Sequence, residues 1–493
     1  MTGLILSSSE VRQIENAAFA EGVDNESLMD LAGAGIASYI LQEEARPGVC
    51  IVYLGKGNNG GDAIVAASHL ERAGWEIWLR MLVDEESLNP LPKKKLRSLA
   101  ADFLRMAGSP LKSLTGLPVI VLDGLLGIGS RGGLSAEVKQ VAREINDLRS
   151  ATSARVYAVD LPSGLADDGA DPDTVVADVT VTIGFPKEAL IRDEAANYVG
   201  RISLVELPDL AKRAPSNPDR AFISIPSNLR SIVPRRHFDS HKGNYGRIGI
   251  VAGSRGFAGA GVLCAEAGAR SGAGLISIFV PEDIYQILAI KMPPEIMVKP
   301  VSDPRVVLEE RLDAVGIGPG IGRQSPDAVL ELISRFVGPM VVDAEGLNLL
   351  AEKPAVLHQC AGARLLTPHP GEMARLWPTK GKSRSQIVRE FTSEYPVTLL
   401  LKGARTIVGA ADMPLSYNSS GTPGQATGGS GDVLTGVCTA LLGRGVSTYD
   451  AGRLGAWLCG KASELALEEE SEESMLPSDT IEYLGKAFRV LIS

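Results

Sequence analysis

Apolar runs of five to seven residues alternate along the chain with longer stretches in which apolar residues recur at helical spacing. The first part of the chain holds six such runs, which predict strands over 50–55, 76–82, 118–123, 155–160, 179–184 and 201–207. Runs rich in Val and Ile with helical spacers are typical of a parallel sheet covered by helices on both faces. Ahead of them, Ser7 and Glu10 have the spacing of a capping box, so a helix is expected to begin there.

A second series of seven runs predicts strands over 247–253, 275–280, 314–320, 340–346, 364–369, 397–403 and 406–410. The stretch "LAKRAPSNPDR" (210–220) between the two series is polar and carries two prolines, so we place a domain boundary near residue 215. A chain of 493 residues is too long for one ordinary core. We therefore predict an α/β protein of two domains, 1–215 and 222–493.

Composition excludes several classes of protein. With 45% hydrophobic and 22% charged residues, the chain is expected to be globular. A net charge of −10 argues against nucleic acid as a partner, because binding phosphates needs clustered Lys and Arg. The five cysteines are widely spaced and form no CxxC pair, which favours reduced thiols over disulfides or zinc ligands. Neither a signal peptide nor an apolar run of membrane-spanning length is evident, so we expect a cytoplasmic protein with no membrane partner.

The first predicted strand runs into a glycine-rich loop, "GKGNNGGDA" (55–63). Four glycines in nine residues after a strand allow backbone N–H groups to face an anion. The spacing matches neither the dinucleotide-binding fingerprint nor the P-loop. A tight strand-to-helix turn with no ligand is the alternative.

Two further strand ends in this half carry polar residues. Asp123 ends one strand, and Asp160 and Ser163 follow another in "AVDLPSG". A single Asp at a strand end is often only a helix cap. Three polar strand ends in one domain favour a site instead, and the oxygens of Asn59, Asp123 and Ser163 could hold a hard cation. Because this set carries one formal negative charge, a monovalent ion fits better than calcium.

Near the other end of the chain, "ATGGSGDVLTG" (426–436) places Asp432 directly after a run of small residues. The apolar stripe that follows predicts a helix with Gly443 as its C-cap. The glycines would then lie at a helix N-terminus, where unpaired N–H groups and the helix dipole attract phosphate. Asp432 could accept the proton of a hydroxyl that attacks phosphorus. The alternative is that Asp432 only caps the helix.

Three other features of the second half fit a nucleotide site. Lys402 follows a buried strand in "LLLKGARTIV", where it could bind a phosphate. The segment "GIGPGIG" (316–322) is a glycine-rich strand end. His369 stands between two prolines in "LTPHPGE", which would hold it rigidly. Such a histidine could contact a substrate or be structural.

The motifs "GNNGGD", "LDGLLGIG" and "VDLPSG" resemble those of the NAD(P)H-hydrate epimerase domain, a Rossmann-like three-layer α/β sandwich, over about residues 5 to 210. The resemblance implies a potassium ion held by Asn59, Asp123 and Ser163. It also implies hydrate contacts from Asn58, Asn59, Gly60, Gly61, Asp62, Gly127, Ile128, Gly129, Ser130, Arg131, Gly132, Gly133 and Asp160. Asp160 is the candidate acid–base residue, whereas structural pairing is expected for Lys187. Ala63 stands where the family pattern has glycine, and its methyl group is expected to narrow the loop without abolishing binding.

In the second half, "HKGNYGRIGIVAGSRGFAGA", "LTPHPGE", "LKGA" and "GTPGQATGGSGDVLTG" resemble the ADP-dependent NAD(P)H-hydrate dehydratase, a ribokinase-like α/β domain, over about 225 to 490. The resemblance implies that Asp432 is the base and that Ala260, Gly320 and His369 contact the hydrate. It implies nucleotide contacts from Lys402, Gly403, Ala404, Arg405, Thr406, Thr422, Pro423, Gly424, Gln425, Ala426, Thr427, Gly428, Gly429, Ser430 and Gly431.

Together the two resemblances predict a bifunctional repair enzyme for hydrated NADH and NADPH. The first domain would interconvert the R and S hydrates, and the second would convert the S hydrate and ADP to NAD(P)H, AMP and phosphate. Mg²⁺ is expected from the phosphoryl-transfer chemistry, and a homo-oligomer, with a tetramer as one form, from the family. The alternative is a ribokinase-like kinase for a vitamin or sugar alcohol with a non-catalytic N-terminal binding module.

Overall fold

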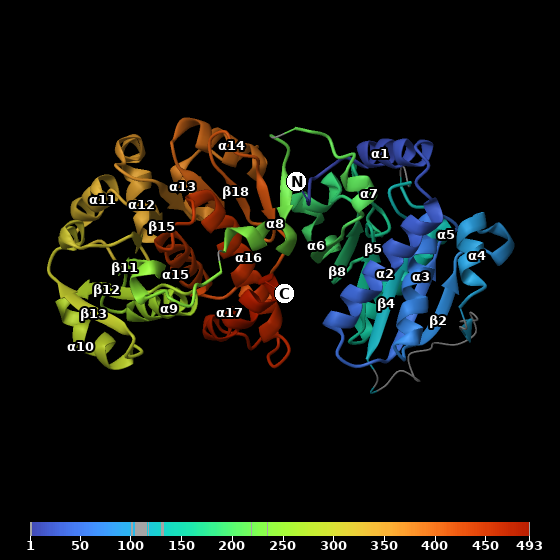
Figure 1. Cartoon of the computed structure of the whole chain (residues 1–493), viewed down its shortest axis with the longest axis horizontal. Coiled ribbons are helices and arrows are strands. Elements are labelled where there is room, and N and C mark those ends of the chain that lie inside the picture. Colours follow the sequence, from blue (N-terminus) through green and yellow to red (C-terminus); the bar gives the residue numbers. More distant parts are fainter. Residues whose placement is uncertain are drawn as a thin grey trace. The chain divides into compact units, whose positions relative to one another are not determined.

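The chain divides into two compact units, residues 1–217 and 218–493 (Figure 1). The structure, a computed structural model, describes residues 2–99, 102–103, 116, 118–129, 133–217, 219–233 and 235–492. Each unit is built around a largely parallel sheet with helices against it. The predicted two-domain α/β architecture is therefore confirmed.

Unit 1 holds a seven-stranded sheet of order β3-β2-β1-β4-β5-β8-β9, in which all neighbours are parallel. Its strands are β1 Val49–Leu54, β2 Glu76–Met81, β3 Asp102–Phe103, β4 Val119–Gly124, β5 Arg155–Val159, β8 Val179–Ile183 and β9 Arg201–Val205. A small antiparallel pair, β6 Leu165–Ala166 and β7 Gly169–Ala170, follows β5. Its helices are α1 Ser8–Ala20, α2 Asn25–Glu43, α3 Asn58–Arg72, α4 Pro90–Leu96, α5 Ala136–Ala151, α6 Ala196–Val199 and α7 Pro208–Ala211.

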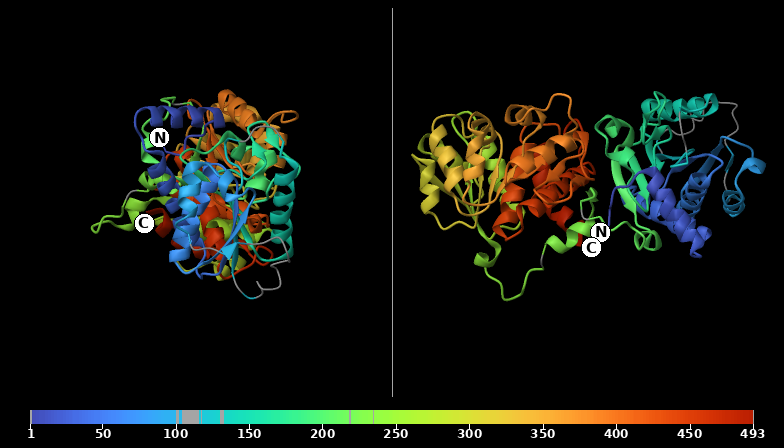
Figure 2. Two further views of the ribbon diagram at one scale, coloured as in Figure 1. Left: turned by 90° about the vertical axis from the view of Figure 1, so that its right-hand side faces the viewer. Right: turned by 90° about the horizontal axis from the view of Figure 1, so that it is seen from above.

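Unit 1 has three layers, a central sheet with helices on each face, because the side chains of β1 point alternately into two cores. Cys50 and Val52 pack in one core with residues of α2 and α3, whereas Ile51 and Tyr53 pack in a second core with residues of α5. Successive strand residues point to opposite faces, so a strand that is apolar at every position needs helices on both sides. The view from above shows the teal helix α5 and the dark blue helix α2 on opposite sides of the sheet (Figure 2, right).

The capping box expected at the first helix is present. The Ser7 hydroxyl accepts a hydrogen bond from the N–H of Glu10 at 3.3 Å, and the Glu10 carboxylate accepts one from the N–H of Ser7 at 2.9 Å. This pairing satisfies two N–H groups at the start of α1.

Unit 2 holds a ten-stranded sheet of order β10-β19-β18-β17-β16-β15-β14-β11-β12-β13. Its neighbours are parallel except where β18 meets β17 and β19. Its strands are β10 Phe222–Ser224, β11 Arg247–Val251, β12 Leu275–Pro281, β13 Ile296–Val301, β14 Ala314–Ile317, β15 Met340–Val342, β16 Arg364–Leu366, β17 Thr398–Leu401, β18 Ile407–Gly409 and β19 Ser416–Asn418. Its helices are α8 Pro226–Leu229, α9 Ala258–Arg270, α10 Glu282–Lys291, α11 Pro326–Arg335, α12 Glu345–Glu352, α13 Pro370–Leu376, α14 Arg384–Glu394, α15 Ser430–Gly443, α16 Thr448–Ala466 and α17 Pro477–Ile492.

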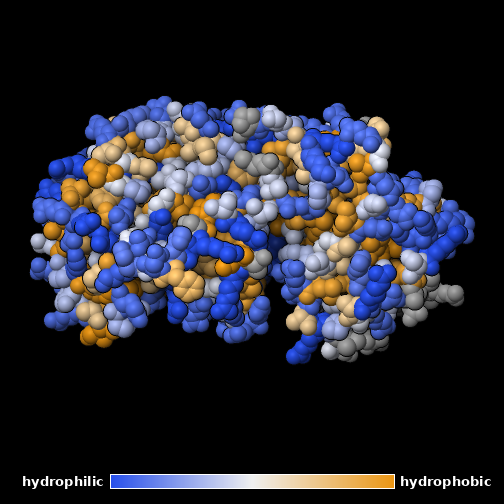
Figure 3. Space-filling model, viewed as in Figure 1, coloured by the Kyte–Doolittle hydropathy of each residue, from blue (hydrophilic) through white to orange (hydrophobic). Residues whose placement is uncertain are grey.

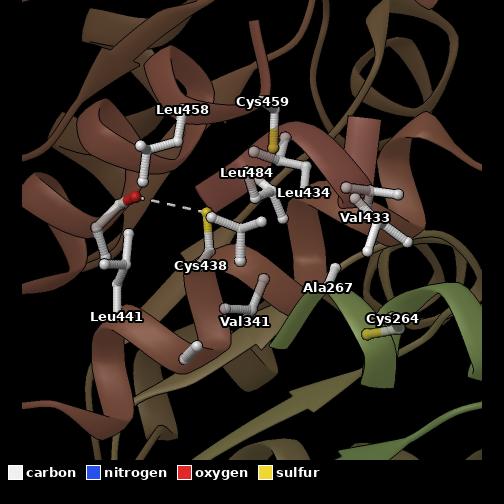
Figure 4. Packing of buried hydrophobic residues seen from close by; sticks show 14 of the residues in the cluster. Cys264, Ala267, Val341, Val433, Leu434, Cys438, Leu441, Leu458, Cys459 and Leu484 are labelled. Atoms are coloured by element: carbon white, nitrogen blue, oxygen red, sulfur yellow. Dashed lines mark hydrogen bonds between the residues drawn. The ribbon is translucent and has the colours of Figure 1, made fainter. Parts of the chain in front are cut away.

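The core of unit 2 contains three of the five cysteines, and all five are free thiols. Cys264 of α9, Cys438 of α15 and Cys459 of α16 lie among leucines and valines (Figure 4). The Cys438 thiol donates to the carbonyl of Ala451 at 3.5 Å. Burial raises the pKa of the Cys459 thiol to about 12, so this thiol stays protonated and packs as a small apolar group.

The predicted strands correspond to strands of the two sheets, but three strands of unit 2 and the two-residue strands β3, β6 and β7 of unit 1 were not predicted. β10 and β19 are short and contain Ser224, Ser416 and Asn418, so they show no apolar run. β13 contains Lys299 and Pro300, which obscure the apolar run of an edge strand. The predicted C-cap was wrong by one residue, since Gly443 is the last helical residue of α15, Arg444 is the C-cap, and Gly445 takes the positive φ of 85°.

Helices α9 and α15 pack so closely that Gly436 has no room for a side chain. A Cβ at this position would lie 2.0 Å from the carbonyl oxygen of Cys264. We expect Gly436→Ala to destabilise unit 2 by about 1–3 kcal/mol, because overpacking forces the backbones apart. Thermal unfolding of the full chain measures the effect.

Gly485 in α17 is the matched control, since nothing lies within 4 Å of a Cβ there. Gly485→Ala should stabilise by about 0.5–1 kcal/mol, because glycine is the poorer helix former. Equal effects of the two substitutions would contradict the packing argument.

Among the described residues, no helix is long and apolar enough to cross a membrane. On the face of the molecule in Figure 3, hydrophilic residues are interspersed with smaller hydrophobic areas.

Candidate active sites

Both sheets gather polar side chains at the carboxyl ends of their strands. In each sheet the first strands are added in one direction and the later strands in the opposite direction. The strand order reverses between β1 and β4 in unit 1 and between β11 and β14 in unit 2. Ligands of open α/β sheets bind outside the carboxyl ends at such switch points. Asn59 and Gly127 follow β1 and β4, and Gly320 follows β14, whereas Asp160, His369 and Lys402 follow other strands of the same sheets.

The loop after β1 leads directly into α3, and Asn58 to Asp62 form its first turn. Gly57 is the N-cap and supplies no side-chain hydrogen bond. A Cβ on Gly60 would lie 2.5 Å from the carbonyl oxygen of Gly55, so this glycine is needed for packing. The close contacts of a tight turn and the bare amides of an anion site are thus both present.

The methyl group of Ala63 does not lie over the loop. Ala63 is a fully buried residue of α3, and a Cβ on Gly124 at the end of β4 would lie 2.6 Å from its Cβ. The departure from the family pattern is therefore accommodated against the sheet.

A hydrogen-bond network brings together the three predicted cation ligands. The Ser163 hydroxyl donates to Asp123 Oδ1 at 2.6 Å, and the Ser163 N–H donates to Oδ2 at 2.8 Å. The N–H of Leu126 donates to Ser163 Oγ at 2.9 Å, and Asn59 Nδ2 donates to the Leu126 carbonyl at 3.0 Å. The Leu126 carbonyl is a further oxygen at this position, and no side-chain pattern pointed to it.

Asp123 is fully buried in this network. Burial raises the pKa of its carboxyl to about 6, although hydrogen bonds from Ser163 and from the Leu125 N–H act in the opposite direction. A positive ion nearby would favour the charged form of this carboxyl.

Asp160 is held by one of its two carboxylate oxygens. Its Oδ1 accepts from the N–H of Ile183 at 2.9 Å, from Thr182 Oγ1 at 3.3 Å and from Lys187 Nζ. Within the described parts of the chain, Oδ2 accepts no hydrogen bond. Asp160 also has a positive φ of 68°, a conformation that a non-glycine residue rarely adopts outside functional sites.

The Lys187 ammonium donates hydrogen bonds to three neighbouring groups. Its side chain is 1% exposed, and besides Asp160 it donates to the Ile183 carbonyl at 2.9 Å and to Thr182 Oγ1 at 3.2 Å. The structural pairing expected for this residue is present, and it fixes the orientation of the Asp160 carboxylate.

The second glycine-rich loop is described only in part, because Ser130, Arg131 and Gly132 lie outside the described residues. Gly127 lies beside Asn59, since a Cβ there would be 3.0 Å from Asn59 Oδ1. Among the described residues, no atom lies within 4 Å of a Cβ at Gly129. The carbonyl of Ile128 accepts a hydrogen bond from Arg12 Nη2 of α1, which joins the first helix to the site.

In unit 2 a lysine and two carboxylates meet where three strands end. Lys402 Nζ lies 2.9 Å from Asp343 Oδ1 and 3.9 Å from Glu372 Oε2. Thr435 of α15 donates to Asp343 Oδ2 at 3.0 Å. Burial lowers the pKa of the Lys402 ammonium, but the charges of Asp343, Glu372 and Asp432 outweigh burial and raise it overall.

Asp432 lies in the first turn of α15 beside this cluster and is not its cap. The N-cap is Gly429, with a φ of 104° and no side-chain cap bond. The Asp432 carboxyl makes no hydrogen bond with any residue that the structure describes. Burial and the charge of Asp343 raise its pKa to about 7, although Lys402 acts in the opposite direction. A carboxyl with a pKa near neutrality suits a general base.

The small residues before Asp432 keep this helix end open. A Cβ on Gly431 would lie 3.2 Å from Lys402 Nζ and 3.4 Å from Asp343 Oδ2, whereas nothing lies within 4 Å of one on Gly428. An uncapped helix N-terminus, a lysine and a carboxyl therefore meet at one place, an arrangement that can stabilise a phosphoryl group.

Of the three predicted hydrate contacts, Ala260 lies in the first turn of α9, Gly320 follows β14 and His369 follows β16. A Cβ on Gly320 would lie 3.1 Å from the Cβ of Ala260, and Ser254 Oγ donates to the Gly320 carbonyl at 2.7 Å. His369 Nδ1 accepts from the Gly371 N–H at 3.0 Å, while the His369 N–H donates to Glu372 at 2.9 Å. Glu372 thus connects His369 to Lys402.

The other predicted nucleotide contacts differ in their surroundings. Arg405 is 5% exposed, and burial lowers its pKa to about 10. Thr422 Oγ1 donates to Glu472 at 2.9 Å, and Gln425 Nε2 donates to the Cys459 carbonyl at 3.4 Å. Ser430 Oγ donates to the Gln425 carbonyl at 2.9 Å, which ties this segment to the start of α15. A carboxylate beside Thr422 is a poor neighbour for phosphate and a suitable one for hydroxyl groups.

Comparisons with known proteins match both halves. The family model described as YjeF-related protein N-terminus matches residues 25–189, and the one described as NAD(P)H-hydrate dehydratase matches residues 248–486. The bifunctional NAD(P)H-hydrate repair enzyme of Moorella thermoacetica is 33% identical, with 99% of this chain and 97% of the relative covered. The enzyme of that name from Escherichia coli is 34% identical, covering 92% of this chain and 88% of the relative.

The chain belongs to the family of bifunctional NAD(P)H-hydrate repair enzymes. Among solved structures, the ADP/ATP-dependent NAD(P)H-hydrate dehydratase of Bacillus subtilis, co-crystallised with ATP and Mg²⁺, is 25% identical with a TM-score of 0.48, covering 55% of this chain and 98% of that one. Full-length relatives of the repair-enzyme family do not favour the alternative of a kinase with a non-catalytic module.

The sequence analysis missed several polar side chains around the two sites, among them Asp343, Glu372, Arg12 and Glu15. Asp343 directly follows the apolar run of β15, the same signal that pointed to Asp123 and Asp160. Glu372 looks like a capping residue of α13, which it also is. Arg12 and Glu15 lie on α1, before the segment that matches the repair-enzyme N-terminal model.

Proposed function

We propose that the two sites divide the repair of hydrated NADH and NADPH between them. Unit 1 interconverts the R and S hydrates, and unit 2 dehydrates the S hydrate with ADP. The observation that carries the proposal is Asp432, a carboxyl in the first turn of α15 that does not cap the helix, has a pKa near 7 and interacts electrostatically with Lys402. The ribokinase-like assignment of unit 2 belongs to this proposal.

In the dehydration step, Asp432 takes the proton of the ring hydroxyl, and the hydroxyl oxygen attacks the terminal phosphorus of ADP. The bond from that phosphorus to the bridging oxygen breaks, and AMP leaves. N–H groups at the start of α15 and the ammonium of Lys402 stabilise the phosphoryl group in transit. The ring nitrogen then expels phosphate, and loss of the neighbouring C–H proton restores the double bond.

The nucleotide would span the segment from Lys402 to the start of α15. Its phosphates would lie at Gly428 to Gly431, and its ribose hydroxyl groups near Thr422, beside Glu472. ADP as the donor, with ATP as the alternative, is part of the proposal.

Mg²⁺ fits this site as an ion that arrives with the nucleotide. Among the described residues, no group of three His, Cys, Asp or Glu forms a ready cage. Mg²⁺ is commonly bound by one or two carboxylates together with substrate phosphates, and Asp343 and Glu372 supply carboxylates here. When bound, the ion would neutralise phosphate charge.

A potassium ion fits unit 1, where Asn59, Asp123, Ser163 and the Leu126 carbonyl offer oxygens around one carboxylate. We expect KCl to raise the thermal unfolding temperature of unit 1 above its value in choline chloride of the same ionic strength. A potassium concentration about ten times the dissociation constant would stabilise the folded state by about 1.4 kcal/mol. Asp123→Asn should abolish the difference between the salts, and a difference that persists would argue against this ligand set.

The experiment that tests the function is incubation of the purified full chain with S hydrate and ADP. The absorbance of reduced nicotinamide should return, with one AMP formed per hydrate consumed. R hydrate alone should give S hydrate, and with ADP it should be consumed completely. If a panel of vitamin or sugar alcohols were phosphorylated while the hydrate stayed unchanged, the proposal would be lost.

The proposal also includes a cytoplasmic location and a homo-oligomeric state. Five free cysteines support a reducing compartment. Sedimentation equilibrium tests the oligomeric state.

A further inference from the structure

Several elements of unit 1 place charged side chains around Asp160. Asp62 lies on the first turn of α3, which packs against β1, β4 and β5. Glu15 and Arg12 lie on α1, and Lys187 follows β8. Three carboxyl groups therefore share this end of the sheet with one lysine and one arginine.

Asp62 and Glu15 differ from Asp160 in their surroundings. Both are half-buried, and neither carboxyl makes a hydrogen bond with a residue in the described ranges. Lys187 is already bonded to Asp160, and Arg12 donates to the carbonyl of Ile128. Asp62 and Glu15 thus have no cation hydrogen-bonded to them among the described residues, and Arg12 Nε is buried without a hydrogen-bond partner there.

The charges around Asp62 favour its protonated form. Burial raises the pKa of Asp62 well above its usual range, the charges of Asp160 and Glu15 raise it further, and Lys187 acts in the opposite direction. Burial likewise raises the pKa of Glu15, against the effect of Lys187 and Arg12 and with that of Asp160. Asp62 in its acid form and the unbonded Oδ2 of Asp160 would supply the proton donor and the proton acceptor that acid–base catalysis needs.

The reaction proposed for this unit needs both forms at once. Hydration of an enamine places the hydroxyl group on the carbon next to the ring nitrogen. Inverting that carbon means breaking its C–O bond on one face and forming a new C–O bond on the other. The leaving hydroxyl must receive a proton, and the incoming water must lose one.

We propose that Asp62 is a second catalytic residue of the epimerase site, acting as the acid while Oδ2 of Asp160 acts as the base. Asp62 protonates the leaving hydroxyl, which departs as water while the ring nitrogen lone pair forms a C=N bond. Water then adds to the other face and gives its proton to Asp160, and the C=N electrons return to nitrogen. Transfer of that proton from Asp160 to Asp62 through water closes the cycle. Glu15 is a positioning residue, whose charge keeps Asp62 protonated.

This inference rests on the proposed epimerase function. It is tested by measuring the conversion of R to S hydrate against pH in the full chain, after subtracting the uncatalysed rate. The wild-type rate should fall at low pH as the base is protonated, and at high pH as the acid loses its proton. Asp62→Asn should lower the rate about 100-fold and remove the high-pH fall.

Glu15→Gln supplies a second measurement that does not depend on removing the acid. Without the charge of Glu15, Asp62 should lose its proton at lower pH, so the high-pH fall should move to lower pH while the rate at its optimum persists. Asp30→Asn is the matched control, because Asp30 is an exposed α2 residue that pairs with Lys95. Its profile should match the wild type.

The possible outcomes distinguish a failure of the role of Asp62 from a failure of the proposed epimerase function. A wild-type chain without epimerase activity overturns the proposed function. An active wild type whose Asp62→Asn variant keeps both the rate and the high-pH fall overturns only the role of Asp62. If Asp62→Asn does not fold, as judged by its unfolding transition, an unmoved profile in Glu15→Gln overturns the inference instead.

Discussion

Asp432→Asn is expected to lower the turnover number of dehydration by about 10²–10⁴-fold, the usual contribution of a positioned base. Nucleotide should bind to the variant at least as tightly as to the wild type, since the substitution removes a negative charge from the phosphate site. Rapid-quench measurement of AMP formation, together with the dissociation constant of ADP, checks both expectations. Epimerisation in unit 1 should be unchanged and is the control for folding.

The pH dependence of dehydration gives this prediction a second readout. The base must be unprotonated, and the pKa of Asp432 is about 7, so the wild-type kcat/KM should fall as the pH drops below about 7. The residual activity of Asp432→Asn should lack this fall. A variant that keeps the wild-type rate and profile would show that Asp432 is not the base.

Asp432→Asn should also stabilise unit 2. The folded pKa of about 7 lies above the ordinary value of 3.8, so between these values the folded state binds more protons than the unfolded state. Stability is therefore lost as pH rises from about 4 to 7. The asparagine variant escapes this loss, and its gain in unfolding temperature should be larger at pH 8 than at pH 5. Catalytic groups commonly reduce stability in this way.

The site residues that the sequence identified share one local signal, a polar residue directly after a buried strand or a glycine run. Asp123, Asp160 and Lys402 come at the ends of apolar runs. In a parallel sheet the carboxyl ends of all strands lie at the same edge, so these residues are expected near one another within each sheet. Asp432 was found because glycines without a packing role imply an open helix end. These positions could be predicted because each depends on local sequence and on the sheet class.

The rest of both sites depends on contacts between segments far apart in the sequence. Glu15 and Arg12 lie on a helix that its capping box and apolar stripe predict only as a helix, and the fold brings them to the loops of unit 1. Likewise, the three donors that converge on Asp160 Oδ1, and the absence of a capping bond at Asp432, are matters of geometry. No spacing in the sequence encodes them.

Asp160→Asn is expected to reduce R-to-S exchange to its uncatalysed rate, because the amide cannot accept a proton. The substitution also leaves the charge of Lys187 buried at 1% exposure without the carboxylate that is hydrogen-bonded to it. Breaking a buried pair in this way costs about 3–5 kcal/mol. Loss of activity alone would therefore not separate catalysis from unfolding.

The double variant Asp160→Asn with Lys187→Met separates the two effects. Removing both partners leaves no unpaired charge, so the unfolding temperature of unit 1 should recover most of what Asp160→Asn lost. Epimerisation should stay at the uncatalysed rate, and dehydration of S hydrate by unit 2 should be normal in both variants. If exchange recovered along with stability, Asp160 would be only a partner for Lys187, and the base of the epimerase site would have to be another residue.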